Sequence, residues 1–465
     1  MMRRALAVCV AAALAACAPV GPDYRRPDVD MPKAYLEPEP AGATLAAIPA
    51  DWWRLYDDAT LDRLVADGLA RATDIRLAIA RIEEAAALLR EANATLLPEV
   101  DASGATSRSG FSAQTPSVRA GSPATVNNFQ LAANTAFELD FWGRLRRLRE
   151  AAQAQYTATQ YARGVVGLTL AGAIARTYFN VRSLDAQIAV SQESLDAADD
   201  SVDITRKRAN AGIASELDVY QAQGNRAQLA AQLKELRRLR AVSMHQLGVL
   251  TGELDLTLSP ADLRALPSPP LPPAGLPSTL LERRPDVRQA EASLTAANAQ
   301  IGVARAAQLP TITLTASLGL QSDNLAHLLS PGTAIWSIGT GLLGPVIDWG
   351  RYAARTEEAE ARARQAEVLY EQAVQNAFRD VSDALSNVAY ASDTEQDLHA
   401  RVDDAGRSLK LATQRYEAGY SAYLEVLDAQ RTLNDAQLAL VRNRQSFLTF
   451  TVDLMSALGG GWSAA

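Results

Sequence analysis

Hydrophobic and polar positions alternate in four short segments of this chain. From Phe129 to Phe141, every second residue is apolar or Thr, and the residues between them are mostly polar. Side chains of a β-strand point alternately to its two faces, so this pattern predicts strands with one apolar and one polar face. An ordinary soluble hairpin has the same pattern, but tilted outer-membrane strands also need about 9–11 residues. We expect strands over about 97–107, 128–141, 310–320 and 334–346.

Two much longer segments, beginning near residues 144 and 351, contain no proline and have the composition of helices. Each runs to a glycine, Gly212 or Gly419, which can end a helix as a left-handed cap. At 1.5 Å per residue, each helix would be about 100 Å long. A second helix follows each glycine, which predicts helical hairpins over about 144–250 and 351–458. A soluble coiled-coil dimer would account for these helices but not for the strands.

The sequence also contains the same pattern twice. Arg208–Gln223 (RANAGIASELDVYQAQ) matches Arg415–Gln430 (RYEAGYSAYLEVLDAQ) at an offset of 207 residues, and Trp142 and Trp349 have the same offset. Several matches in one register predict a tandem duplication, with a repeat too long for an ordinary solenoid unit.

The N-terminus has the features of a bacterial lipoprotein signal. Arg3 and Arg4 precede an apolar run that is too short to cross a bilayer and ends in Leu14-Ala-Ala-Cys17. This predicts that Cys17 carries a covalent lipid (N-palmitoyl and S-diacylglycerol); an ordinary cleavage site is the alternative. Ala18, rather than Asp, favours sorting to the outer membrane.

The predicted parts are a signal peptide (1–16), a lipidated N-terminal segment (17–58), repeat one (59–253), a proline-rich linker (254–285) and repeat two with a C-terminal tail (286–465).

Composition and charge exclude several classes of function. The 465 residues are 48% hydrophobic and carry a net charge of −8, so the chain lacks the basic excess of nucleic-acid-binding proteins. Two Cys and three isolated His offer no metal site, and there is no phosphate-binding glycine loop or nucleophile elbow. We therefore expect no catalytic residue, no metal and no cofactor other than the lipid. No apolar run of about 18 residues follows the N-terminus, so no transmembrane helix is expected.

Five motifs carry a resemblance to a known family. They are CAPVGPDY at Cys17–Tyr24, Asp51-Trp52-Trp53 followed by Leu61 and Leu64, FELDFWGR at Phe137–Arg144, the segment Leu280–Pro310 beginning LLERRPDVRQ, and ALGGGW at Ala457–Trp462. Together they resemble the TolC-like outer-membrane efflux channels, in the lipoprotein branch of NodT/OprM-like outer membrane factors.

The resemblance implies an α+β membrane protein that works as a homotrimer. Each protomer would contribute four strands to a twelve-stranded transmembrane β-barrel, and its long helices to a coiled-coil barrel through the periplasm, with an equatorial region formed by the linker and the segments near the termini. The implied function is a passive exit duct for drugs or other small molecules, as in multidrug resistance. Its implied partners are outer-membrane lipid, a periplasmic membrane-fusion (adaptor) protein and an inner-membrane transporter of the RND type. Type I protein secretion is the alternative.

The resemblance also implies a periplasmic gate. Asp428 and Glu425 match its acidic residues, and Tyr416 matches a tyrosine tied to an aspartate, here Asp218, on a neighbouring hairpin. A solvated helix face would equally explain the two acids, and interhelical packing the tyrosine. Some relatives carry an Arg two residues after the tip glycine where this chain has Ser421, so a charged latch there would be weaker or replaced.

The remaining implied sites lie at the two ends of the hairpins. Gly212 and Gly419 would form the tips that contact the adaptor. Trp142 and Trp349, which follow predicted strands, would be membrane-interface aromatics, with core packing as the alternative.

Overall fold

The computed structural model describes residues 19–37, 48–110, 125–275 and 277–462, so Cys17 and the predicted signal peptide lie outside the described residues. The chain forms two compact units. Of the described residues, unit 1 comprises 19–28, 82–110, 125–159 and 290–370, and unit 2 comprises 29–37, 48–81, 160–275, 277–289 and 371–462. Both units therefore draw on both predicted repeats.

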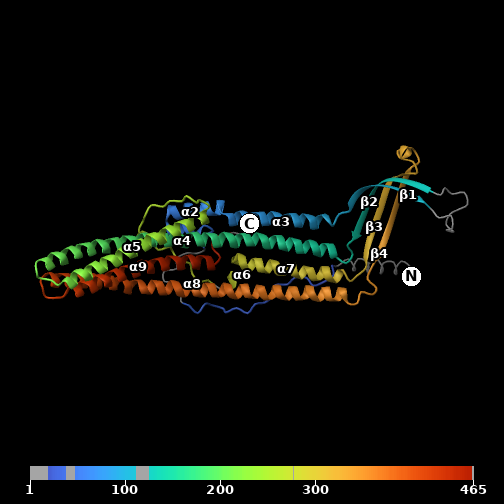
Figure 1. Ribbon diagram of the computed structural model, residues 1–465. Helices are drawn as coiled ribbons and strands as arrows, with labels where there is room; N and C mark the ends of the chain where they lie inside the picture. The colour runs from blue at the N-terminus through green and yellow to red at the C-terminus, as the bar shows by residue number, and fades with distance from the viewer. Residues whose placement is uncertain (1–18, 38–47, 111–124, 276, 463–465) are drawn as a thin grey trace. The chain divides into compact units, whose positions relative to one another are not determined.

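Unit 1 contains one antiparallel sheet with the strand order β1-β2-β3-β4, and Figure 1 shows the strands side by side. Their bounds lie within a few residues of the expected segments: β1 (Glu99–Gly110), β2 (Thr125–Leu139), β3 (Thr311–Ser322) and β4 (Ala334–Leu343). Strand β2 ends before the expected residue 141. The reason is that the Asp140 carboxylate accepts hydrogen bonds from the backbone N–H groups of Leu145 and Arg146, and so caps the next helix.

The helical part of unit 1 is built on small side chains. It contains most of α3 (Thr73–Ala94) and α7 (Pro285–Ala306), together with the first turns of α4 (Arg144–Asn210) and α8 (Arg351–Glu417). Ile301 of α7 packs against Ala359 and Ala363 of α8. A short helix, η4 (Leu325–His327), lies between β3 and β4.

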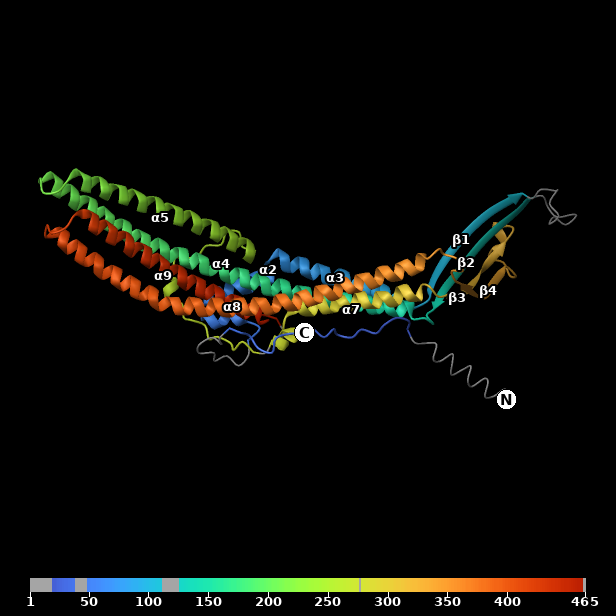
Figure 2. The ribbon, with the colours of Figure 1, turned by 90° about the horizontal axis from the view of Figure 1, so that it is seen from below.

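Unit 2 consists mainly of two helical hairpins, whose turns lie at the same end in Figures 1 and 2. One is formed by α4 and α5 (Glu216–Thr251), and the other by α8 and α9 (Tyr423–Ala457). Two helices precede the sheet, α2 (Ala59–Arg71) and α3, and they are divided at Ala72, whose φ of −56° and ψ of 141° are not helical. An aromatic cluster of Trp52, Tyr56 and Phe179 is buried beside α2.

Among its described residues, the proline-rich linker contains only the short elements η2 (Leu263–Ala265), η3 (Pro277–Thr279) and α6 (Leu280–Arg283). Arginines of the hairpins bind its backbone. Arg182 donates to the Ser259 carbonyl at 2.6 Å, and Arg444 donates to the Leu266 carbonyl at 2.7 Å. These contacts satisfy carbonyl groups that have no helix or sheet partner.

The tandem duplication is confirmed by the long helices. Helices α4 and α8 each have 67 residues, and both bounds of α8 lie 207 residues beyond those of α4 (351 against 144, and 417 against 210). Among the described helices, none is both long enough and apolar enough to cross a membrane.

Candidate functional site

The register of the sheet gathers the apolar positions of all four strands on one face. Val100 pairs with Thr135, Thr135 with Ala316 and Ala316 with Ile338, so these side chains form one row across the sheet. The next row on the same face is Ala102, Ala133, Leu318 and Trp336. The large members are open to the surroundings: Val100 is 70% exposed, Leu318 66%, Trp336 74% and Ile338 72%. A soluble sheet would bury such a face against a core.

The opposite face is polar and small. Asn134 Nδ2 donates to Ser103 Oγ at 2.8 Å, and Ser317 Oγ donates to Asn134 Oδ1 at 2.9 Å, which links three strands. On the same face Gly319 lies so close to β2 that a Cβ there would come within 2.4 Å of the Leu131 carbonyl oxygen. One face of the sheet is therefore suited to lipid and the other to water.

The sheet has two outer edges, formed by β1 and β4. The backbone N–H and C=O groups along such edges need partners, and hydrocarbon provides none. A sheet with this apolar face can enter a bilayer only if its edges are paired with other strands.

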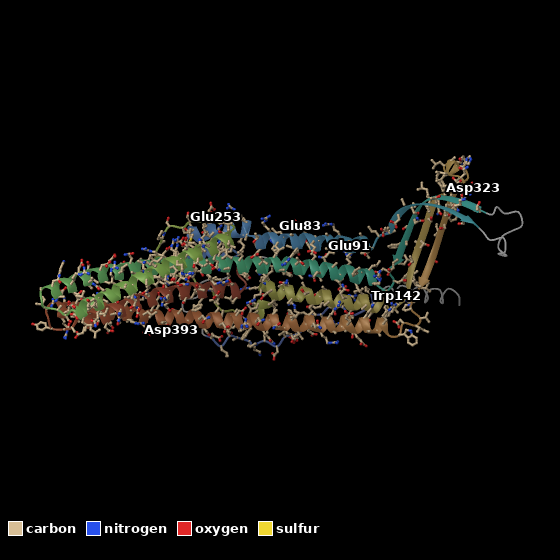
Figure 3. The ribbon with its side chains drawn as sticks, in the orientation of Figure 1. Glu83, Glu91, Trp142, Glu253, Asp323 and Asp393 are labelled. Carbon is tan, nitrogen blue, oxygen red and sulfur yellow. The ribbon has the colours of Figure 1, made fainter. Side chains whose placement is uncertain are left out.

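The two tryptophans differ in their surroundings. Trp142, labelled in Figure 3, is half-buried, and its indole Nε1 donates to the Pro310 carbonyl at 2.7 Å, just before β3 begins. Trp349 lies six residues beyond Leu343, where β4 ends, and is 94% exposed. Trp142 therefore joins the sheet to α4, whereas Trp349 is free to contact the surroundings.

The tips of the two hairpins have the same backbone structure. Gly212 and Gly419 adopt φ values of 76° and 80°. The next residue of each tip donates back along the helix, Ile213 to the Arg208 carbonyl at 3.0 Å and Tyr420 to the Arg415 carbonyl at 2.8 Å, which completes a Schellman cap. Large apolar side chains around the caps are exposed, namely Ile213 (65%), Leu217 (60%), Tyr220 (66%), Tyr420 (81%) and Leu424 (56%).

Tyr416 lies inside the tip rather than on its surface. It is 6% exposed and packs edge-on against Tyr423 within a small core. Its hydroxyl has no hydrogen-bond partner among the described residues, so no bond to Asp218 is present in the protomer. Burial, reinforced by the nearby Asp218 carboxylate, raises the pKa of the Tyr416 phenol. Ser421 Oγ is also buried, without a hydrogen-bond partner in the described part of the chain.

The two candidate gate carboxylates are exposed on α9. Glu425 lies 3.6 Å from Arg415, and both side chains are more than half exposed, so this ion pair is weak. Asp428 is exposed and makes no ion pair within the described ranges.

Arg208 is a residue of the tip that the predicted site residues did not include. Its guanidinium carbon lies 4.7 Å from the centre of the Tyr416 ring, and its Nη1 donates to the Glu417 carbonyl at 3.2 Å. Arg208 on α4 therefore contacts α8 and connects the two hairpins. The repeat offset could have drawn attention to it, because Arg208 occupies the position of Arg415 in the other repeat.

In the described part of the chain, no group of three or more His, Cys, Asp or Glu residues is arranged to bind a metal ion. The site thus consists of a two-faced sheet in unit 1 and paired helical tips in unit 2.

Comparisons with known proteins agree on one family. The family model described as "Outer membrane efflux protein" matches residues 64–253 and again residues 276–460, once in each repeat. The chain is 33% identical over 471 residues to the cation efflux system protein CusC of Escherichia coli O6:H1, covering 98% of both chains. It is 34% identical over 454 residues to the antibiotic efflux pump outer membrane protein ArpC of Pseudomonas putida, covering 95% of this chain and 92% of ArpC.

A solved structure shares the architecture. The outer-membrane channel OprN superposes with a TM-score of 0.88 at 29% sequence identity, covering 95% of this chain and 99% of OprN.

Proposed function

Given that this chain belongs to the outer membrane efflux protein family and is an outer-membrane efflux channel, not an enzyme, we propose that three copies assemble to form one passive exit duct. The observation that carries this proposal is the four-stranded sheet with one apolar face, one polar face and two unpaired edges. Pairing β1 of each protomer with β4 of the next leaves no edge open. Three sheets of four strands then give a barrel of twelve, within the range of outer-membrane barrels.

Adjacent residues of β4 provide a matched test, because Ile338 lies on the apolar face and Ser337 on the polar face. A lysine on the lipid-facing side of a barrel costs about 2–4 kcal/mol near the bilayer midplane. Ile338→Lys should therefore reduce insertion into lipid vesicles, whereas Ser337→Lys should insert normally. Native mass spectrometry of the inserted protein should give three protomers. The opposite ranking of the two variants, or a monomeric mass, would refute the barrel.

The end of unit 2 that is formed by the two hairpin tips is proposed to bind a periplasmic adaptor, and through it an inner-membrane pump of the RND type. The exposed apolar side chains around the caps support this, because clustered apolar groups of this size usually mark a protein contact. A Cβ at Gly212 or Gly419 would meet nothing within 4 Å, so a partner can approach the backbone closely at both tips.

The same end is proposed to contain the gate. In a trimer Asp428 and Glu425 would each form a ring of three carboxylates, which would attract multivalent cations. The contact between Arg208 and Tyr416 would hold the two hairpins of each protomer together in the closed state.

A covalent lipid on Cys17 is proposed to anchor the N-terminus in the outer membrane. The apolar run that ends in Leu14-Ala-Ala-Cys17 supports it. Intact-mass measurement of the mature protein tests it, since the Cys17→Ser variant should lack the mass of the acyl chains.

The cargo is proposed to be small molecules or ions rather than proteins. The two relatives named above are efflux proteins, for cations and for antibiotics, which favours efflux over type I secretion. Deletion of the gene should increase drug or metal susceptibility and leave exported proteins unchanged. Loss of an exported protein with unchanged susceptibility would support secretion.

A further inference from the structure

Residues 19–26, here called the strap, include the last six residues of the CAPVGPDY motif and lie along the junction between β2 and α4. The backbone N–H of Val20 donates to the carbonyl of Trp142 at 2.9 Å. The next residue, Gly143, has a φ of 76°, and a Cβ there would come within 2.6 Å of Pro19. The strap therefore begins in close contact with the turn that ends the strand.

The strap also packs directly on the backbone of α7. A Cβ at Gly302 would lie 2.7 Å from the Val20 carbonyl oxygen, and a Cβ at Gly21 would lie 2.6 Å from Gly302 Cα. A real Cβ atom essentially never lies within 3.0 Å of a non-bonded atom, so this close approach requires glycine on both segments.

Polar side chains hold the rest of the strap. The Arg147 side chain, 5% exposed, donates to Asp23 Oδ1 at 2.7 Å and to the carbonyl of Gly21 at 3.3 Å. Asn298 Nδ2 donates to the Pro22 carbonyl at 2.9 Å. Further along, Arg26 makes two bonds of 2.7 and 2.9 Å to the Glu291 carboxylate. Contacts along the length of the strap thus tie it to unit 1.

We propose that the strap is a positioning element, which holds the acylated N-terminus beside the strands so that the lipid chains enter the bilayer where the sheet does. This rests on the lipid anchor proposed above for Cys17. Only Ala18 separates Cys17 from Pro19, so two steps of the chain span at most about 7 Å. If the strap lost its contacts as far as Arg26, the free chain between Cys17 and Arg26 would span up to about 30 Å. The strap therefore restricts the anchor to the neighbourhood of the turn at Trp142 and Gly143.

Two variants separate this role from folding. An insertion of about eight Gly and Ser residues between Ala18 and Pro19 leaves every strap contact possible but lengthens the tether. Because effective concentration falls with about the −3/2 power of tether length, the anchor's concentration at the junction should fall about tenfold. Gly302→Ala should instead expel the strap without weakening α7, since Ala is the better helix former. Gly406→Ala is the matched control, because a Cβ there meets nothing within 4 Å.

The measurement is the initial rate at which protease-resistant, membrane-inserted protein appears after induction, with intact mass reporting Cys17 acylation in each variant. We expect the added Gly/Ser segment and Gly302→Ala each to slow this rate severalfold, and Gly406→Ala to match the wild type. Normal insertion kinetics for an acylated chain with the lengthened tether would overturn the proposal, because a purely structural strap tolerates that change. An unacylated wild type would refute the lipid anchor itself, and this inference with it.

Discussion

Replacing Arg208 with Ala is expected to loosen the contact between the two hairpin tips and favour the open duct. The substitution removes a cation–π contact of 4.7 Å to Tyr416 and a hydrogen bond of 3.2 Å to the Glu417 carbonyl. A partly desolvated cation–π contact and one such hydrogen bond together contribute about 2 kcal/mol. If both contacts break on opening, the open-to-closed ratio of one protomer's tips should rise about thirtyfold, since 1.4 kcal/mol corresponds to a factor of ten.

The assay is conductance in planar lipid bilayers, and Arg415→Ala is the control. Arg415 occupies the same position at the end of α8, so the loss of a cation from the last helical turn is common to both variants. Its guanidinium is 3.6 Å from Glu425, in a pair that is more than half exposed and is worth about 0–1 kcal/mol. We therefore expect a large rise in open probability for Arg208→Ala and a small one for Arg415→Ala.

Equal effects of the two arginine variants, or no effect of Arg208→Ala, would refute this reasoning. Tyr416→Phe distinguishes the ring from the hydroxyl. The hydroxyl has no hydrogen-bond partner in the described part of the protomer, so Tyr416→Phe should conduct like the wild type. Opening by Tyr416→Phe would instead support a latch through the hydroxyl to an aspartate.

Three further changes test other parts of the account. Asp428→Ala should raise conductance and weaken block by multivalent cations, and unchanged conductance and block would place the constriction elsewhere. Gly319→Ala should destabilise the sheet by about 2 kcal/mol through collision with β2. Gly104→Ala, whose Cβ would be 4.0 Å from its nearest neighbour, should leave the unfolding temperature unchanged. Trp349→Ala should reduce insertion into vesicles but leave the unfolding temperature in detergent unaltered, because Trp349 is 94% exposed. A lower unfolding temperature would show that the indole packs against the rest of the protein.

The fold could largely be predicted from two periodicities in the sequence. Alternation of period two located the strands, because residues such as Leu318 and Trp336 must point away from the polar face. Repetition at 207 residues related the helices, and both bounds of α8 follow from those of α4. The register between strands could not be predicted, because it depends on close contacts such as that of Gly319 with β2.

The site was less predictable, for a physical reason. The tip glycines are visible in the sequence because a left-handed cap selects glycine. The repeat offset marks the position of Arg208, but not its role, since that depends on two hairpins that are distant in sequence and adjacent in space. The strap is similar: CAPVGPDY was visible as a motif, but its contacts with Arg147 and Gly302 required the fold.

The proposed function requires this chain to form a conducting duct by assembling into a trimer. Recording from the purified full-length protein in planar bilayers tests it most directly. We expect discrete conductance steps that need no energy source and grow larger or more frequent with Arg208→Ala. Protein that inserts into the bilayer but never conducts, even with Arg208→Ala or Asp428→Ala, would contradict it.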